Sequence, residues 1–325
     1  MKSFTAVAGI VGVGILVAFA GFAAAQPAYP NKPIRVITPF PPGGTTTILA
    51  RLVGQKLTER WGQVVIVDNR PGGNTIIGTE ALTKAPADGY TLLLTTNVHV
   101  IIPNLQPTPY DVIRDFAAVT TLANSETLIV VHPSVAASNL QALIALAKAN
   151  PGQLNYASGG SGGPSHLAGE FFNILAGVKT QHVPYKGSAQ SLLGVVGGQV
   201  QIYYSPAIVA IPHVKGGRVR AIAISGNARL SALPDVPTVT EAGLDGFDVG
   251  LWYGVLAPAR TPKAIIEMTA AAIGTSLATA NVRETLSNQG LDPLVSTPAQ
   301  FTELMKSDLA KFARVIRTAN IKLEQ

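Results

Sequence analysis

Segments with strand-like and helix-like patterns alternate along this chain from Ile34 onward, and no other feature constrains its fold as strongly. A run rich in β-branched residues at 34–38 precedes apolar residues that recur at helical spacing through Leu57, and apolar extended runs follow at 64–67 and 90–94. Such alternation is typical of βαβ units, in which helices cover the faces of a sheet. The sequence therefore predicts an α/β fold of mostly parallel sheets flanked by helices.

The same alternation fills the middle third of the chain, so the sequence predicts two lobes. With 325 residues, 47% of them hydrophobic, the chain is long enough to bury two medium-sized cores. The long apolar runs at 128–132 and 249–256 are candidates for strands that cross between the lobes. We expect lobe 1 to comprise residues 26–127 together with 235–325, lobe 2 to comprise 128–234, and a ligand cleft to lie between them.

The first 25 residues have the features of a secretory signal peptide. Lys2 is their only charge, the stretch 4–19 is almost wholly apolar, and three alanines precede Gln26. A membrane anchor is the alternative, but the apolar stretch is short, contains glycines and ends in small residues. We therefore expect a signal peptide at 1–25 and an exported chain that does not span the membrane after cleavage.

The composition excludes several classes of protein. The chain contains no cysteine, so it forms no disulfide and is not a lipoprotein. Its formal net charge of +6 is scattered, and the densest basic stretch, at 215–220, has no interleaved aromatic residue. This pattern argues against a nucleic-acid groove and favours small anions as ligands. No glycine-rich nucleotide motif opens a predicted helix, and His166 with Glu170 lacks further metal ligands, so we expect no cofactor and no metal.

A glycine-rich turn at 158–166 lies between an extended run and a predicted helix start. Such a turn presents backbone N–H groups to an anion, and Pro164 suits the first helical turn. Residues 159–163 also match G-x-S-x-G, the nucleophile elbow of serine hydrolases, but no histidine follows His213. A triad would have to combine Ser161, Glu170 and His213. We favour the anion-binding interpretation; the alternatives are this hydrolase and an ordinary glycine-rich connection.

A second segment of the same kind, at 39–47, follows another extended run and opens another helix. Its prolines stiffen the approach, its two glycines free the backbone for close contact, and its threonine hydroxyls can cap the helix or bind a ligand. A plain turn with a threonine N-cap is the alternative. Two such turns that face each other across a cleft would hold a dicarboxylate.

A third candidate region is the end of the strand predicted at 200–204, where Tyr203, Tyr204 and Ser205 stand. Side chains at this position in an α/β protein of two lobes face the cleft. Neighbouring residues of a strand point to opposite faces, so core packing is the alternative for one of the tyrosines.

Several ordered motifs make the chain similar to a known family. They lie at 29–35, 39–44, 68–72, 87–92, 151–156, 182–187, 233–238 and 256–258, with Thr261 and Pro262 after the last. In this order they resemble the periplasmic solute receptors of tripartite tricarboxylate transporters, the Bordetella-uptake-gene or Bug family. The resemblance implies a periplasmic binding protein of type II-like fold whose two lobes close on a carboxylate. It also implies a location in the periplasm, permease subunits as partners and no enzymatic activity.

The resemblance assigns ligand contacts to both glycine-containing turns. These are Pro42, Gly43, Gly44 and Thr45 from the first, and Ser158, Gly159, Ser161 and Gly162 from the second, with Ser165 and His166 matching a recurrent Ser–His pair. Many relatives carry Asp at the position of Thr47 and a Phe–Asp-like pair near Tyr204 and Ser205. We include these three residues in the predicted site. Loss of acidic groups favours a dicarboxylate or an aromatic carboxylate over an amino acid. A ligand-sensing partner of a signalling receptor is a further alternative.

Overall fold

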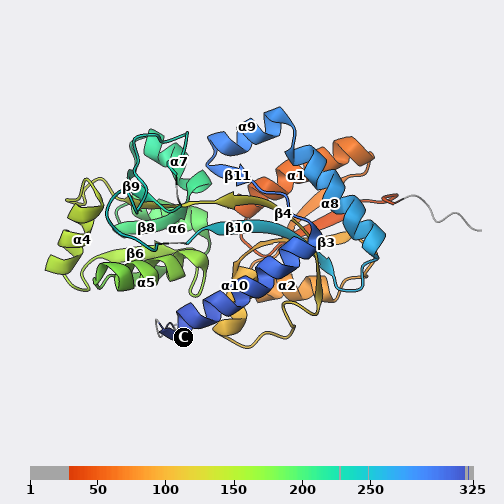
Figure 1. Ribbon diagram of the computed structural model, residues 1–325, viewed down its shortest axis with the longest axis horizontal. Helices are drawn as coiled ribbons and strands as arrows, with labels where there is room; N and C mark the ends of the chain where they lie inside the picture. Colours follow the sequence, from red (N-terminus) through yellow and green to blue (C-terminus); the bar gives the residue numbers. More distant parts are fainter. Residues whose placement is uncertain (1–28, 227, 248, 319–320, 322–325) are drawn as a thin grey trace, which may run out of the picture.

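The computed structural model describes residues 29–226, 228–247, 249–318 and 321. The predicted signal peptide at 1–25 lies outside the described residues. The described chain forms two α/β lobes, each built on its own sheet, as the sequence predicts (Figure 1). In that view lobe 2, largely green, lies on the left, and lobe 1 lies on the right.

The sheet of lobe 1 has six strands in the order β11-β4-β10-β3-β1-β2. Strands β1, β2 and β3 are parallel, whereas β10 pairs antiparallel with both β3 and β4, and β11 pairs antiparallel with β4. Their bounds are β1 Ile34–Thr38, β2 Val65–Asn69, β3 Thr91–Thr96, β4 Phe116–Ser125, β10 Leu251–Pro258 and β11 Leu291–Pro293. The sheet is therefore mixed, which corrects the expectation of mostly parallel sheets.

The sheet of lobe 2 has five strands in the order β7-β6-β8-β5-β9. Strand β6 is parallel to β7 and β8, and β5 is antiparallel to β8 and β9. The bounds are β5 Thr127–Val131, β6 Asn155–Ser158, β7 Gln181–Pro184, β8 Ile202–Pro206 and β9 Arg220–Ile224. This sheet is mixed as well. In both lobes the strand beside the crossings, β10 or β5, runs antiparallel to its neighbours. The alternation of segments in the sequence does not indicate the direction of these strands.

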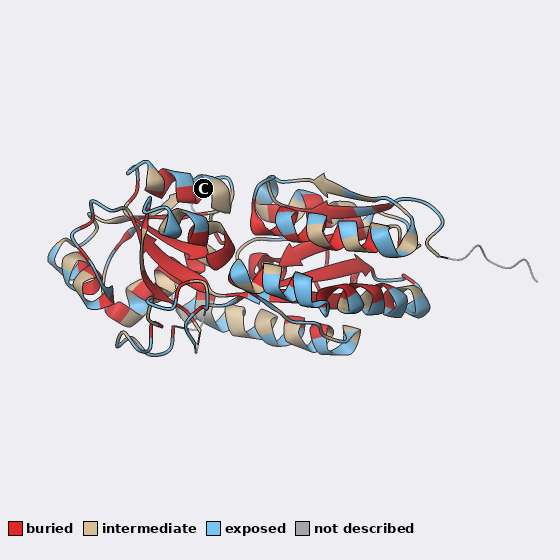
Figure 2. Ribbon diagram, turned by 90° about the horizontal axis from the view of Figure 1, so that it is seen from above, coloured by how far each residue is buried: buried red, intermediate tan, exposed pale blue. Residues whose placement is uncertain are grey.

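The helices cover both faces of each sheet, and their outer faces are exposed while the central strands are mostly buried (Figure 2). In lobe 1 they are α1 Thr45–Trp61, α2 Ile76–Thr83, α3 Val98–Ile101, α8 Lys263–Leu277, α9 Ala280–Asn288 and α10 Pro298–Thr318, with short 3-10 helices at Gly73–Thr75 and Ile102–Asn104. In lobe 2 they are α4 Leu140–Ala149, α5 Pro164–Ala176, α6 Ser188–Val196 and α7 Ala207–Lys215. Within the described ranges no single helix is long and apolar enough to cross a membrane. Helices α8 and α9 together reach the length and composition of a membrane span, but they are bent by 74° at the break between them.

Alternating side chains on β5 and β8 divide the core of lobe 2 between two faces. Ile129 and Tyr204 pack with α4 and α5 on one face, whereas Val130 and Tyr203 pack with α6 and α7 on the other. Side chains of a strand alternate with a period of two, so adjacent tyrosines belong to different cores. Helices α5 and α7 thus lie on opposite faces of the same sheet.

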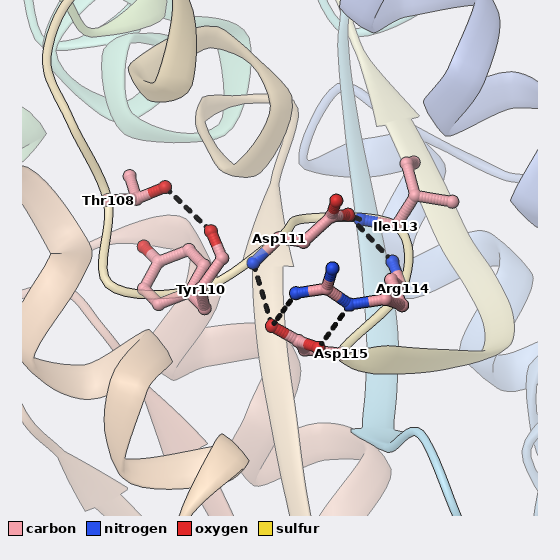
Figure 3. A network of polar contacts seen from close by, with 6 residues as sticks. All are labelled: Thr108, Tyr110, Asp111, Ile113, Arg114 and Asp115. Atoms are coloured by element: carbon pink, nitrogen blue, oxygen red, sulfur yellow. Dashed lines mark hydrogen bonds and ion pairs between the residues drawn. The ribbon is translucent and has the colours of Figure 1, made fainter.

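Two segments of chain cross between the lobes side by side. The first joins β4 to β5 through Glu126, and the second leads from Val249 into β10. The Thr127 hydroxyl donates a hydrogen bond to the Val249 carbonyl at 3.1 Å, which links the two crossings. A loop at 108–115 leads into β4. In this loop the Asp111 carboxylate accepts hydrogen bonds from the N–H groups of Arg114 and Ile113, and these bonds lower the pKa of Asp111 (Figure 3).

Residues between β9 and the second crossing pack on lobe 2. The Val239 N–H donates to the Ile224 carbonyl at 2.8 Å, and the Phe247 ring stacks on Phe171 of α5 with ring centroids 6.2 Å apart. This packing does not fit the expected boundary at 234/235, which followed the proline-rich composition of that stretch. We propose that lobe 2 extends to about Val249.

Candidate functional site

A cavity of about 540 Å³ lies between the lobes, and both lobes line it. Segments at 39–46 and 71–75 contribute from lobe 1, together with Tyr253 of β10. Segments at 159–165 and 185–190 contribute from lobe 2. The two glycine-rich turns of the sequence therefore meet at one cavity.

Three helices, α1, α5 and α6, begin at this cavity. Each has a glycine at the N-cap, namely Gly44, Gly163 and Gly187, and none of the three caps makes a side-chain hydrogen bond. The first N–H groups of a helix have no partner within the helix and carry the positive end of its dipole. Glycine caps leave these groups accessible, so the cavity collects positive potential from three helices.

The first turn, at 41–46, keeps its donors open. Gly43 adopts a left-handed backbone with φ of 90°, which favours glycine. The N–H groups of Thr45 and Thr46 have no hydrogen-bond partner among the described residues. The amide of Asn69, at the end of β2, donates to Thr47 Oγ1 at 2.8 Å and braces the turn from behind.

The second turn, at 159–165, uses most of its donors internally. Ser165 Oγ accepts the Gly159 N–H at 3.2 Å, and His166 Nδ1 accepts the Gly162 N–H at 2.9 Å. Ser158 Oγ likewise accepts the Gly160 N–H at 3.2 Å. Of the described N–H groups of this turn, those of Ser161 and Ser165 have no partner, and both residues line the cavity.

Two stacked histidines brace the second turn from below. The rings of His166 and His182 lie 3.9 Å apart at 15°, and His182 Nε2 lies 2.5 Å from Ser158 Oγ. Burial lowers the pKa of His166 to about 4. Burial, and then the neighbouring His166, lower the pKa of His182 to about 3. Both rings are neutral at pH 7, so His166 Nδ1 is free to accept the Gly162 N–H and the ring proton lies on Nε2.

The structure divides the predicted site residues into two groups. Those that line the cavity are Pro42, Gly44, Thr45, Gly159, Ser161, Ser165 and Tyr204. Those that do not are Gly43, Thr47, Ser158, Gly162, His166 and Ser205. Members of the second group shape or brace the turns; Ser205, for example, is fully buried and donates to the Pro206 carbonyl at 3.1 Å.

Sequence reasoning missed part of the cavity wall. It overlooked the start of α6 at 185–190, the loop residue Asn74, whose φ is 52°, and Tyr253. The motif at 182–187 ends in a glycine that precedes a helix, and this glycine could have predicted that α6 begins at the cavity. Tyr253 offered none, because it stands inside an apolar strand.

The lobes are closed in this structure. A Cβ placed on Gly44 of lobe 1 would lie 3.2 Å from Ser188 Oγ of lobe 2. A Cβ placed on Gly187 of lobe 2 would lie 3.4 Å from Pro41 carbons of lobe 1. Glycine at both positions therefore permits close contact between the lobes.

The electrostatics of the lining favour an anion. Lys186 is the one lysine or arginine among the residues that line the cavity, and none of them is an aspartate or glutamate. Within the part of the chain that the structure describes, no cluster of three or more His, Asp or Glu side chains could hold a metal ion.

The residues of the alternative hydrolase triad do not come together. Glu170 of α5 accepts a hydrogen bond from the Tyr156 hydroxyl at 2.5 Å. His213 lies on α7, across the sheet from α5, and Ser161 lies in the turn that precedes α5. The G-x-S-x-G match therefore has neither its acid nor its base in place.

Two α/β lobes that close on a cavity lined by helix N-termini define a solute-binding protein of two lobes. The chain belongs to the tripartite tricarboxylate transporter receptor family, whose model matches residues 49–321. It is 35% identical to protein BugT of Bordetella pertussis over 317 residues, which are 96% of this chain and 97% of BugT.

Solved structures show the same fold. R. palustris Rpa4515 with adipate is 30% identical, with a TM-score of 0.88 over 91% of this chain and 100% of that chain. MatC (Rpa3494) from Rhodopseudomonas palustris with bound malate is 28% identical, with a TM-score of 0.83 over 89% of this chain and 100% of that chain. The family and its structural neighbours are periplasmic binding proteins that take small solutes.

Proposed function

We propose that this chain is an exported, non-enzymatic receptor of the periplasm that captures a small carboxylate. The observation that carries the proposal is the cavity between the lobes, where three glycine-capped helices begin and no acidic side chain lies in the wall. Adipate and malate in related structures support a carboxylate ligand. Each hydrogen bond to a charged oxygen contributes about 1.5–3 kcal/mol, so a few preorganised donors suffice for micromolar binding.

The ligand class that fits best is a dicarboxylate or an aromatic carboxylate. An amino acid brings an ammonium, which needs an acidic partner, and none of the lining residues supplies one. A cavity of about 540 Å³ accommodates a small diacid or a benzene ring with carboxylates. Tyr203 and Tyr204 of β8 add aromatic surface.

The test is mass spectrometry of the ligand that copurifies with the protein, followed by calorimetry against succinate, terephthalate and glutamate. A ligand at a hundredfold excess over its dissociation constant raises the stability of the fold by about 2.7 kcal/mol, so thermal shift gives an independent signal. We expect a diacid or terephthalate to bind. Binding of glutamate alone would contradict the proposed ligand class.

We further propose that the closed receptor delivers its ligand to permease subunits of a tripartite tricarboxylate transporter, because closure presents a surface that the open form lacks. Deleting either the receptor gene or the permease genes should abolish uptake of the labelled ligand. Uptake that persists without the receptor, together with a lost transcriptional response to the ligand, would favour the signalling alternative. Ester turnover that disappears in Ser161→Ala would favour the hydrolase.

A further inference from the structure

Two buried tyrosines, one from each lobe, line the cavity. Tyr203 is the second residue of β8 in lobe 2 and is fully buried; Tyr253 stands in β10 of lobe 1 and is 2% exposed. Ionised Tyr253 would repel ionised Tyr203, which adds to the effect of burial in raising the pKa of Tyr203. The two phenols therefore line the same cavity from opposite lobes.

The hydroxyl of Tyr203 has no hydrogen-bond partner among the described residues. The hydroxyls of Ser191 and Ser165, in the first turns of α6 and α5, approach it and lower its pKa, but neither forms a hydrogen bond of good geometry with it. A buried hydroxyl without a partner is costly, because it has lost its hydrogen bonds to water and gained none in the protein. Tyrosine at this position is thus unfavourable for the fold, and phenylalanine would fill the same space.

A similar arrangement exists in lobe 1. The Thr45 hydroxyl, in the first turn of α1, is buried and has no hydrogen-bond partner in the described part of the chain. It lies near the Tyr253 hydroxyl and lowers its pKa, against the larger effect of burial, which raises that pKa to about 12. Unsatisfied hydroxyls from both lobes therefore gather where α1, α5 and α6 begin.

The chemistry of these groups suits a carboxylate oxygen. Burial keeps both phenols neutral, so each retains a proton to donate at any physiological pH. The helix N-termini beside them favour negative charge and disfavour an ammonium. A charge-assisted hydrogen bond between a phenol and a carboxylate is short and strong.

We propose that Tyr203 and Tyr253 are specificity-determining residues that hold the same carboxylate of the ligand from opposite lobes, in a contact that forms only when the lobes close. This inference rests on the proposed function, because it requires a carboxylate in this cavity. The neighbouring Tyr204 also lines the cavity, and its buried hydroxyl likewise has no hydrogen-bond partner among the described residues. The Tyr204 ring packs among Tyr156 and Phe172, each with its centroid 5.6 Å away, in the core beneath α5.

The test compares the full exported chain with Tyr203→Phe, Tyr253→Phe and the double variant. The probe is whichever of succinate, adipate and terephthalate the wild-type protein binds most tightly by calorimetry. We expect each single substitution to weaken binding by about tenfold to a hundredfold, the range for a hydrogen bond to a charged group. The double variant should lose less than the product of the two single losses, because both phenols serve one group.

The apparent melting temperature without ligand separates a binding role from a structural one. It should stay the same or rise in Tyr203→Phe, because the substitution removes an unsatisfied hydroxyl. A fall in melting temperature that parallels the loss of affinity would overturn the inference. Affinity should also be constant between about pH 6 and pH 9, because neither phenol titrates there.

Tyr110→Phe is the matched control. Tyr110 is a buried tyrosine of lobe 1 that packs against Phe116 away from the cavity, so its loss should leave affinity unchanged. Wild-type protein that binds none of the three acids contradicts the proposed function. Wild-type protein that binds, with Tyr203→Phe and Tyr253→Phe binding equally well, overturns this inference alone.

Discussion

The first turn, at 41–46, and the second turn, at 159–165, look alike in sequence but serve the cavity differently. In the first turn the N–H groups of Thr45 and Thr46 have no partner among the described residues, so they remain available to a ligand. In the second turn Gly159 and Gly162 donate to Ser165 and His166. The first turn therefore keeps the backbone donors at its helix start open, whereas most donors of the second turn are taken by groups that fix its shape.

The difference shows that a glycine-rich helix start does not by itself give an open anion site. An open site requires that nearby side chains do not accept hydrogen bonds from the N–H groups of the turn. Asn69 braces the first turn through the Thr47 side chain and leaves the backbone open. His166 braces the second turn through the backbone itself, and His182 stacks beneath it. We expect the second turn to be the more sensitive to mutation.

The largest effect should come from His166→Leu. This substitution leaves the buried Gly162 N–H without an acceptor and removes the stacking partner of His182, so unfolding free energy should fall by about 2–3 kcal/mol. Ligand affinity should fall more than tenfold as the turn loses its shape. Urea denaturation and calorimetry measure the two effects.

The matched change in the first turn is Thr47→Val. Asn69 keeps the Phe40 carbonyl as an acceptor, so the loss should be about 1 kcal/mol. An equal or greater loss than in His166→Leu would contradict the contrast between the turns.

A second effect should appear as pH falls. The pKa of His166 lies at about 4 in the folded protein, below its ordinary value of 6.5, so between these values the unfolded chain binds the proton and the folded chain does not. Stability should therefore be full above pH 6.5 and decline as pH falls toward 4. His166→Asn, which keeps an acceptor and does not titrate, should decline less.

Buried His99 of lobe 1, with a pKa of about 4, contributes the same slope to both proteins, so the difference between them reports His166 together with its effect on the pKa of His182. The Asn69 brace of the first turn does not titrate. Identical pH profiles for wild type and His166→Asn would refute this account of the second turn.

Gly43→Ala should have a smaller effect. Its φ of 90° disfavours alanine, although no atom lies within 4 Å of the new Cβ, so the change should cost about 1–2 kcal/mol of stability. Gly62→Ala, at the end of α1 with φ of 67° and equally open space, is the control. Both should lose similar stability, but affinity should fall only in Gly43→Ala. Equal affinities would show that the first turn tolerates reshaping.

The smallest effect should come from Gly44→Ala, which brings a methyl group 3.2 Å from Ser188 Oγ in the closed form. Because a serine side chain moves easily, we expect only a severalfold loss of affinity and no change in stability without ligand. Adding Ser188→Ala should restore binding. Failure of this rescue would mean that the two residues do not meet when the ligand is bound.

The sequence predicted the two lobes and the position of both turns, because strand-to-helix alternation and glycine pairs are local signals. It did not predict which N–H groups remain open, since Asn69 and His182 reach the turns from strands distant along the chain. It also placed the end of lobe 2 at a proline-rich stretch, whereas Phe247 packs against Phe171 from 76 positions earlier. Neither packing partner is visible from composition.

The chain by itself therefore determined its α/β class, its glycine-capped helix starts and its lack of acidic residues in the turns, all of which follow from neighbours in sequence. Only the tertiary structure decided that three helices begin at one cavity, that the second turn is braced by a histidine pair, and that Tyr203 and Tyr253 line this cavity from opposite lobes. The physical reason is that these features depend on contacts between distant strands, whose order and direction are set by how the two cores pack.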